Sequence, residues 1–476
     1  MMASTTTDWL DEGRIADTLA RSSTVDSGQI QAILTKAREL KGLAIDEVAA
    51  LLALEQPDLL AAVFETARWV KNEIYGRRIV MFAPLYYSNS CCNECVYCAF
   101  RRSNRELARK TLSQAQIARE TAALIDQGHK RLLLIAGESV TDAGFQHLLD
   151  AIATVYSVKR GSGEIRRVNV NVAPLSVEEF RALKAAGIGT YQLFQETYHR
   201  KTYAEVHIAG RKSDFDWRLN AIDRAMEAGI DDVGIGPLLG LADWRFDLLA
   251  MMQHIAHLEE RFGVGCHTIS VPRMEPALGS TMSEAPPHHV TDADFKKIVA
   301  VLRLAVPYTG IIMSTRETAE MRRDTFSLGV SQVSGGSRTD PGGYADAADA
   351  AGAAAAAAAA DDAGQFQVGD HRSLDDVVRD IAEVGFTPSF CTACYRMGRT
   401  GRDFMDLAKP GLIREMCGPN ALSTFVEYLE DYASPATVEA GERAIRRELD
   451  AMDPKIRHYS EIMIAKVRDG KRDVFR

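Results

Sequence analysis

The chain has 476 residues, of which 46% are hydrophobic and 25% are charged, the proportions of an ordinary globular protein. Its net charge of −9 at pH 7 does not provide the basic surface that nucleic-acid binding requires, so we expect no nucleic-acid partner. No run of about 18 strongly apolar residues and no leader pattern is visible, which predicts no membrane association. We expect a cytoplasmic protein, or one of the organelle stroma or matrix in a eukaryote.

Residues 1–75 have helical periodicity and predict a helical extension packed on the following domain. From residue 76 to 340, apolar β-branched runs alternate with helical stretches, two of which begin with capping boxes at Ser113 and Ser176. Eight runs predict strands, at residues 77–88, 129–139, 166–176, 189–198, 231–240, 265–274, 308–317 and 327–337. One apolar helix face is expected from Phe215 to Met226. Eight strand–helix units predict an α/β fold, a (β/α)8 TIM-type barrel with its chemistry at the carboxyl ends of the strands.

The remainder of the chain divides into two parts. Residues 341–370 include a low-complexity run rich in alanine, which favours helix but buries little apolar area, and we assign it no chemistry. Residues 371–476 contain an amphipathic helix, a cysteine motif and a final helical module. We interpret them as a C-terminal helical domain that holds an auxiliary cluster.

Eight cysteines are too few for a disulfide scaffold in a chain of this length, and they are clustered. Cys91, Cys95 and Cys98 follow the first predicted strand with the spacing C-x3-C-x2-C. Three thiolates on one short loop can hold three irons of a [4Fe-4S] cluster and leave the fourth iron open. A structural zinc site is the alternative, but it needs four closed ligands, and the adjacent Cys92 points away from Cys91 in most backbone geometries.

A second set has the spacing C-x2-C-x22-C and consists of Cys391, Cys394 and Cys417. No fourth thiol is near it in the predicted fold. The pattern favours a second iron–sulfur cluster with an open iron, although a histidine could instead complete a zinc site.

The first motif, with aromatic Tyr97 before its last cysteine, resembles the signature of the radical S-adenosylmethionine (SAM) enzymes. The resemblance implies that SAM binds the open iron and is cleaved reductively to a 5′-deoxyadenosyl radical, with electrons from a low-potential donor. It also implies that several residues, mostly at strand ends, contact SAM: Tyr97, Gly137, Glu138, Glu196, Arg218, Gly234 and Gly236. A purely structural role is the alternative for each of them.

Segments along nearly the whole chain resemble one branch of these enzymes, the HydG family of tyrosine lyases that mature [FeFe]-hydrogenase. They include "FQETY", "HTISVPRMEPA", "SRTDPGGY" and "CTACYRMGRTGRDFM". The resemblance implies that L-tyrosine is cleaved between Cα and Cβ to p-cresol and dehydroglycine, which then yields carbon monoxide and cyanide for an iron synthon. Hydrogenase-maturation scaffold proteins are the implied partners.

The same resemblance implies catalytic or iron-binding roles for three side chains. Glu196 and Arg316 would be catalytic, with Arg316 pairing with the tyrosine carboxylate. His267 would bind a labile fifth iron at the auxiliary cluster. Two positions depart from the family pattern: Ala99 replaces a usual glycine, and Cys266 replaces a usual proline and adds a thiol that could compete with His267 for iron.

Two other functions fit parts of the sequence. One is 2-iminoacetate synthase, the tyrosine lyase of thiamine biosynthesis, which shares the barrel but lacks the C-terminal cysteines. The other is an iron–sulfur carrier or scaffold without turnover. The C-terminal cysteines count against the first alternative, and the eight predicted strands, which build a pocket that a carrier does not need, count against the second.

Overall fold

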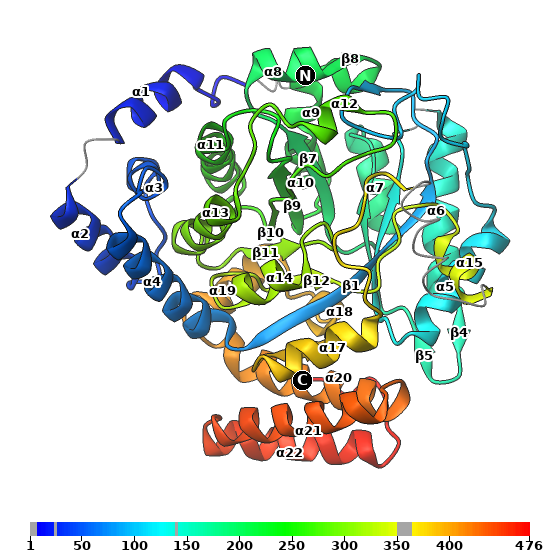
Figure 1. Ribbon diagram of the computed structural model, residues 1–476. Helices are drawn as coiled ribbons and strands as arrows, with labels where there is room; N and C mark the ends of the chain where they lie inside the picture. Colours follow the sequence, from blue (N-terminus) through cyan, green and yellow to red (C-terminus); the bar gives the residue numbers. More distant parts are fainter. Residues whose placement is uncertain (1–6, 23–25, 139–140, 350–363) are drawn as a thin grey trace.

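The computed structural model describes residues 7–22, 26–138, 141–349 and 364–476, and its centre is a closed barrel of eight parallel strands (Figure 1). Hydrogen bonds join the strands in the order β12-β11-β10-β9-β7-β6-β3-β1, and β12 pairs with β1 to close the barrel. The strands are β1 (Arg78–Ser88), β3 (Arg131–Ala136), β6 (Arg167–Asn171), β7 (Tyr191–Glu196), β9 (Val233–Pro237), β10 (Thr268–Ser270), β11 (Gly310–Met313) and β12 (Gln332–Ser334). Each lies within one of the eight predicted runs, so the predicted barrel is confirmed.

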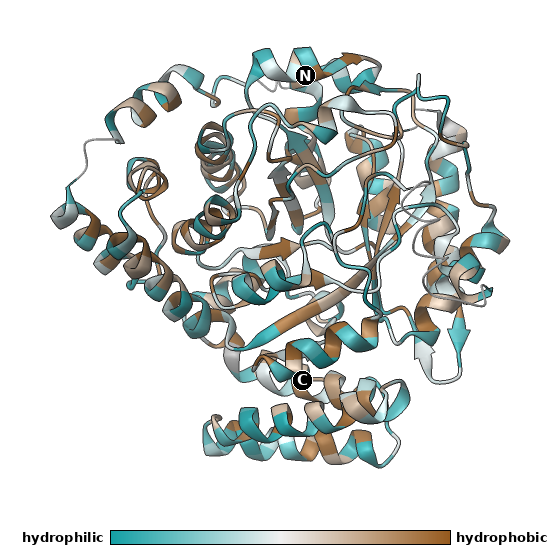
Figure 2. Cartoon of the chain, viewed as in Figure 1, coloured by the Kyte–Doolittle hydropathy of each residue, from teal (hydrophilic) through white to brown (hydrophobic). Residues whose placement is uncertain are grey.

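The side chains of β1 show how the barrel is packed. Ile79, Met81 and Ala83 belong to the hydrophobic core between the barrel and its helices. The alternate residues Phe82 and Tyr86 face the interior and line a cavity, as the two-residue period of a strand requires. Because both of its faces are buried, β1 reads as a nearly continuous apolar run, and it appears largely brown in Figure 2.

Helices surround the barrel and connect successive strands. They are α5 (Gln114–Asp126), α6 (Asp142–Ser157), α7 (Val177–Ala185), α8 (Arg200–Val206), α9 (Phe215–Leu219), α10 (Ala221–Glu227), α11 (Trp244–Phe262), α12 (Thr281–Glu284), α13 (Asp292–Ala305), α14 (Ala319–Phe326) and α15 (Gly343–Asp349). The predicted capping boxes at Ser113 and Ser176 are present. The predicted single helix from Phe215 to Met226 is instead two, because the backbone leaves the helical conformation at Asn220.

The expected N-terminal helices precede the barrel and lie along one side of it (Figure 1). They are α1 (Glu12–Ser22), α2 (Ser27–Ala37), α3 (Ile45–Leu52) and α4 (Pro57–Tyr75). Helices α3 and α4 pack against α13, and α1 and α3 pack against α11. The core is therefore continuous from this extension into the barrel.

The C-terminal region closes the amino-terminal end of the barrel. It comprises α17 (Leu374–Glu383), β13 (Thr387–Ser389), α18 (Ala393–Arg396), α19 (Gly401–Ala408), α20 (Ile413–Asp431), α21 (Pro435–Asp450) and α22 (Pro454–Arg468). Strand β13, which the sequence did not predict, pairs in parallel with the first residues of β1, Arg78 opposite Thr387. It leads the chain directly to Cys391 beneath the barrel.

Most of the alanine-rich run lies in residues 350–363, outside the described residues, so the expectation for it is not addressed. In the described part of the chain, no helix has the length and apolarity needed to cross a lipid bilayer.

Two candidate iron–sulfur sites at opposite ends of the barrel

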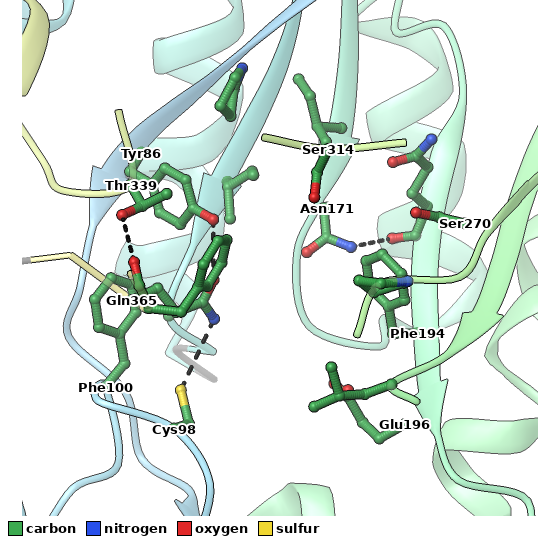
Figure 3. A pocket seen from close by; sticks show the side chains of 18 of the residues that line it. Tyr86, Cys98, Phe100, Asn171, Phe194, Glu196, Ser270, Ser314, Thr339 and Gln365 are labelled. Atoms are coloured by element: carbon green, nitrogen blue, oxygen red, sulfur yellow. Dashed lines mark hydrogen bonds between the residues drawn. The ribbon is translucent and has the colours of Figure 1, made fainter. Parts of the chain in front are cut away.

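The first site is a cavity at the carboxyl ends of the strands, with about 1390 Å³ of empty space including its open mouth. Cys91, Cys95 and Cys98 line it together. Figure 3 shows Cys98 and Gln365 on one side and Glu196 on the other. The structure therefore brings the three predicted thiols together, facing the strand ends where a barrel places its chemistry. Cys92 does not line the cavity.

Short strands hold the cysteine loop in place. Strand β2 (Glu94–Cys95) pairs antiparallel with β8 (His207–Ala209), so Cys95 lies opposite His207. The Tyr97 hydroxyl lies 2.9 Å from His207 Nε2. On the other side of the loop, a β-carbon at Gly137 would come within 2.5 Å of the Ser90 carbonyl oxygen. Gly137 is thus required because the end of β3 approaches the cysteine loop at backbone distance.

Two carboxylates and two cations form the polar wall of this cavity. Arg218 donates to Glu138 at 2.6 Å and lies 3.6 Å from Glu196. Lys212, on the short helix η1 (Arg211–Ser213), donates to Glu196 at 2.6 Å. Burial opposes charge on Glu138, but Arg218 and Lys212 outweigh it and lower its pKa. Glu138, Arg218 and Lys212 are therefore held in their charged forms in a mostly enclosed site.

Glu196 has an unusual backbone. Its φ of 73° lies in the left-handed region, which costs free energy for a residue with a side chain. The pairing of β7 with β9 shifts register between Phe194 and Glu196, which ends the strand and points the Glu196 carboxylate at Lys212. Strain at the end of a barrel strand is typical of a functional position.

The opposite wall is apolar and carries one cation. Phe82, Phe100 and Phe366 line it, and the guanidinium of Arg316 lies 3.2 Å from the centre of the Phe366 ring. No carboxylate within 4 Å of Arg316 is found in the described ranges. Glu275, which also lines the cavity, has its pKa raised to about 7 by burial, with Arg316 opposing that shift.

These residues fit a three-thiolate cluster with SAM. Burial and, to a smaller extent, Glu138 raise the pKa of the Cys91 thiol to about 12, so this thiol would lose its proton only when metal binds. The open face of the cysteine loop meets the charged wall, which offers partners for an amino group and a carboxylate. The apolar wall offers space for rings. The cavity thus suits an iron–sulfur cluster with a zwitterionic ligand.

The second site lies at the opposite, amino-terminal end of the barrel. Cys391, Cys394 and Cys417 line one cavity together with His267. The His267 ring packs edge-to-face on Phe404 of α19, with ring centres 4.8 Å apart. The structure thus brings together the four predicted ligands at the auxiliary cluster: Cys391 follows β13, Cys394 lies in α18, Cys417 lies in α20, and His267 immediately precedes β10. This end was not predicted, because the barrel pattern places chemistry at the other.

The charged side chains that line the second cavity favour the deprotonated, thiolate form of its cysteines. A hydrogen bond from the Cys394 thiol lowers the pKa of Cys417 despite burial, and Arg78 at the start of β1 lowers it further. The same hydrogen bond raises the pKa of Cys394. Arg131 and Arg399 also line the cavity. Three guanidinium groups stabilise negative charge there, as an anionic cluster on three thiolates would need. In the described residues, no three acidic, histidine or cysteine side chains are preset to hold a single metal ion.

Cys266 does not compete with His267 for this cavity. Its side chain has no exposed area and belongs to the hydrophobic core, where burial raises its pKa, with a further contribution from Glu259 on α11. The side chain of Cys266 lies in the core, whereas the side chain of the adjacent His267 lies in the cavity. The concern that Cys266 would take the place of His267 is therefore not supported by the geometry.

The two cavities share the barrel interior. Along β1, the inward-facing residues Arg78 and Val80 line the second cavity and Phe82, Pro84 and Tyr86 line the first. From Arg78 to Tyr86 the strand extends by roughly 26 Å, at about 3.3 Å per residue. Strands β3, β11 and β12 divide their inward residues in the same way. The sites are thus two ends of one lumen.

The glycines of β9 face this lumen. A β-carbon at Gly236 would overlap the carbonyl oxygen of Ser270, and one at Gly234 would lie 2.5 Å from Thr268 Oγ1. Neither glycine lines the first cavity. Close packing of β9 against β10 explains both residues, and their predicted contact with SAM stays a prediction.

Several residues at the first site were missed by sequence reasoning. Lys212 and Asn93 belong to its polar wall: Asn93 donates to Glu138 at 2.7 Å and accepts from the Lys212 backbone at 3.0 Å. Gln365 donates to Cys98 Sγ at 3.8 Å and accepts from the Tyr86 hydroxyl at 2.9 Å. Asn93 lies at a variable position of the cysteine motif, and Lys212 and Gln365 belong to no motif, so only packing could reveal their contacts.

Known proteins match this chain in parts and as a whole. Residues 85–252 match the radical SAM superfamily, and residues 270–387 match the biotin and thiamin synthesis associated domain. The 2-iminoacetate synthase of Escherichia coli K12 is 35% identical over 324 residues, 67% of this chain and 82% of that protein. A crystal structure of HydG, a maturase of the [FeFe]-hydrogenase, has a TM-score of 0.93 and 46% identity, covering 99% of this chain and 100% of that one.

The chain belongs to the HydG family. HydG from Carboxydothermus hydrogenoformans also matches, with a TM-score of 0.82 and 41% identity over 95% of this chain and 97% of that chain. The matches to HydG therefore extend through the C-terminal region that holds the second cavity, whereas the match to 2-iminoacetate synthase covers only two thirds of the chain.

Proposed function

We propose that this HydG-family chain cleaves the Cα–Cβ bond of L-tyrosine to p-cresol and dehydroglycine. We further propose that it converts the dehydroglycine to carbon monoxide and cyanide for the iron synthon of [FeFe]-hydrogenase. The observation that carries the proposal is the pair of three-thiol cavities at the two ends of one barrel lumen. A lyase acting at a single site would need only one of them. The division of the chain into 1–75, 76–340, 341–370 and 371–476 belongs to the same proposal.

At the first cavity, Cys91, Cys95 and Cys98 would hold a [4Fe-4S] cluster. The cluster and SAM, once bound, supply the radical chemistry, with electrons from a low-potential donor. The chain's own part is to hold SAM: Glu138 accepts from its amino group, and the cationic Arg218 and Lys212 face its carboxylate. Because these side chains are already paired with one another, little reorganisation is needed when SAM binds.

Tyrosine would bind against the apolar wall of the same cavity. Arg316, held over Phe366, offers its guanidinium to the tyrosine carboxylate, and the phenylalanines of the wall pack on the phenol ring. Glu275, whose pKa burial raises to about 7, can accept or return a proton of the bound amino acid near neutral pH. The enclosure by these walls excludes water from the reacting carbon atoms.

Dehydroglycine would then cross the lumen to the second cavity. The inward face of the barrel carries some polar side chains, with Asn171, Gln192 and Ser270 at the first site and Gln332 at the second. Such groups can hydrogen-bond a small polar fragment. At the second cavity, Cys391, Cys394 and Cys417 would hold the auxiliary cluster and His267 the labile iron. The product would pass from there to a hydrogenase-maturation scaffold protein.

The experiment that tests this function is anaerobic reconstitution with iron and sulfide, followed by SAM, a reductant and tyrosine. We expect deoxyadenosine, p-cresol and carbon monoxide to form together. A chain that makes p-cresol but no carbon monoxide would be a 2-iminoacetate synthase in activity. A reconstituted chain that consumes no SAM would be a carrier or scaffold.

A further inference from the structure

Asp232 is a buried carboxylate that the proposed function does not yet use. It immediately precedes β9 and lines the second cavity, with only 2% of its surface exposed. Neither of its side-chain oxygens has a hydrogen-bond partner among the residues that the structure describes. A buried charge without partners is expensive. Its two oxygens are therefore available to bind a ligand that is not part of the protein.

The imidazole of His267 lies close to this carboxylate. Asp232 Oδ2 lies 3.9 Å from His267 Nε2, which is too long for a hydrogen bond. Two groups bonded to one divalent first-row metal at about 2.1 Å each lie roughly 3 to 4 Å apart. The separation therefore fits two ligands of one ion better than it fits a direct pair.

We infer that Asp232 is a second protein ligand, beside His267, of an iron(II) ion in this cavity. The inference rests on the proposed function, because the ion is the labile iron expected next to the auxiliary cluster. An imidazole and a carboxylate are ligands that iron(II) accepts. The negative charge of Asp232 also offsets the positive charge of an ion bound among Arg78, Arg131 and Arg399, which line the same cavity.

If Asp232 had a structural role, its side chain would accept hydrogen bonds that hold another element in place, and among the described residues it accepts none. Its neighbour Asp231 has such a role, because it accepts a hydrogen bond from Thr400 at 3.2 Å at the start of α19. Asp232 forms no ion pair within 4 Å with the three arginines of the cavity. The adjacent pair therefore offers one aspartate that fastens α19 and one that faces the cavity unpaired.

The test compares Asp232→Asn with Asp231→Asn and His267→Ala after the same anaerobic reconstitution. Iron per chain, the affinity for added iron(II) and the electron paramagnetic resonance spectrum of the auxiliary cluster are measured. We expect the parent and Asp231→Asn to retain one iron more than His267→Ala. Asp232→Asn should bind that iron at least about 10-fold more weakly, and both iron–sulfur clusters should remain. Formation of p-cresol by the parent and by Asp231→Asn, whose side chain lines neither cavity, reports on the proposed function separately and should be the same in both.

The melting temperature without metal adds a second criterion. Removing an unpaired buried charge should leave Asp232→Asn at least as stable as the parent chain before reconstitution. The parent should gain more stability from added iron(II) than the variant does. Unchanged iron affinity in Asp232→Asn, no extra iron in the parent, or a variant that fails to fold would each overturn the inference.

Discussion

Arg218 is the residue on which the polar wall of the first cavity depends. It is almost fully buried, and burial alone would lower its pKa, but Glu138 and other anionic neighbours raise it. It also donates to the Phe194 carbonyl at 2.7 Å, at the end of β7. Its guanidinium therefore fixes two carboxylates and one strand end at once, as the planar, multiply donating group of arginine allows.

Asp247 has a buried carboxyl group that lowers the stability of the folded chain at neutral pH. It lies in the first turn of α11 and accepts hydrogen bonds from Thr197 Oγ1 at 2.9 Å and from the Tyr198 backbone at 2.7 Å. Its other oxygen has no partner in the described part of the chain. Burial raises its pKa to about 7. The folded chain thus binds this proton more tightly than the unfolded chain, and stability falls as the pH rises from about 4 to 7.

Replacing Asp247 with asparagine should remove this pH dependence. Asparagine keeps the accepting oxygen and carries no charge, so Asp247→Asn should exceed the parent in melting temperature at pH 8 and lose the advantage at pH 5. The difference in unfolding free energy between the two pH values should be on the order of 1 to 4 kcal/mol. Circular dichroism melts of the metal-free chain measure it, with the exposed Asp17→Asn as control. A difference that is constant with pH would refute the assignment.

At the scale of elements, α20 carries Cys417 and is fastened to the barrel by a buried ion cluster. Glu427 of α20 accepts from Arg166 at 2.5 Å and lies 3.3 Å from Lys130. All three are nearly inaccessible to solvent. Burial opposes the charge on Glu427, but the hydrogen bond and charge of Arg166 together with the charge of Lys130 outweigh burial and lower the pKa of Glu427. The contribution of this carboxylate to stability is therefore present at neutral pH and lost in acid.

Glu427→Ala should leave Lys130 without an ion pair in the interior and Arg166 with only Asp473, 3.3 Å away, as a partner. We expect the free energy of unfolding to fall by about 3 to 5 kcal/mol at pH 7, with less effect as the pH approaches 4. The auxiliary cluster should also load less iron, because Cys417 shares the helix. Urea denaturation and iron analysis measure both quantities. The exposed Glu430→Ala on the same helix should change stability by no more than about 0.5 kcal/mol. Equal losses in the two variants would contradict the role of the cluster.

The elements that the sequence predicted are those with a strong local pattern. The eight barrel strands follow from apolar runs between capped helices, and both capping boxes are present. Strand β13 has three residues, Thr387–Ser389, one of them proline, and no alternation, so nothing local marks it as a strand. Yet this strand brings Cys391 under the barrel. The break at Asn220 was missed because the apolar spacing continues across it.

At the scale of the whole molecule, the arrangement of the two sites could not be read from the sequence. The spacing within each cysteine set indicated a cluster, but their separation at opposite ends of the lumen depends on β13 pairing with the start of β1. The place of Asp232 also depends on long-range packing. In sequence it is one of two adjacent aspartates, and only the pairing of β9 with β10 brings it near His267. Long-range contacts, rather than local preferences, determine both.

We propose that tyrosine is cleaved at one end of the barrel and that its small fragment is processed at the other. The measurement that tests it most directly is p-cresol and carbon monoxide per SAM consumed, under strict anaerobiosis. It compares the parent with Cys95→Ala and with a Cys394→Ala, Cys417→Ala double variant. Cys92→Ala, whose thiol lies outside the first cavity, is the control and should match the parent.

We expect Cys95→Ala to make neither p-cresol nor carbon monoxide, because the first cluster is lost. The double variant should still make p-cresol, since Glu196, Arg316 and the first three thiols are untouched at the far end of the lumen, but it should make no carbon monoxide. If the double variant loses p-cresol as completely as Cys95→Ala does, with its first cluster intact by spectroscopy, the division of tasks between the two ends is wrong.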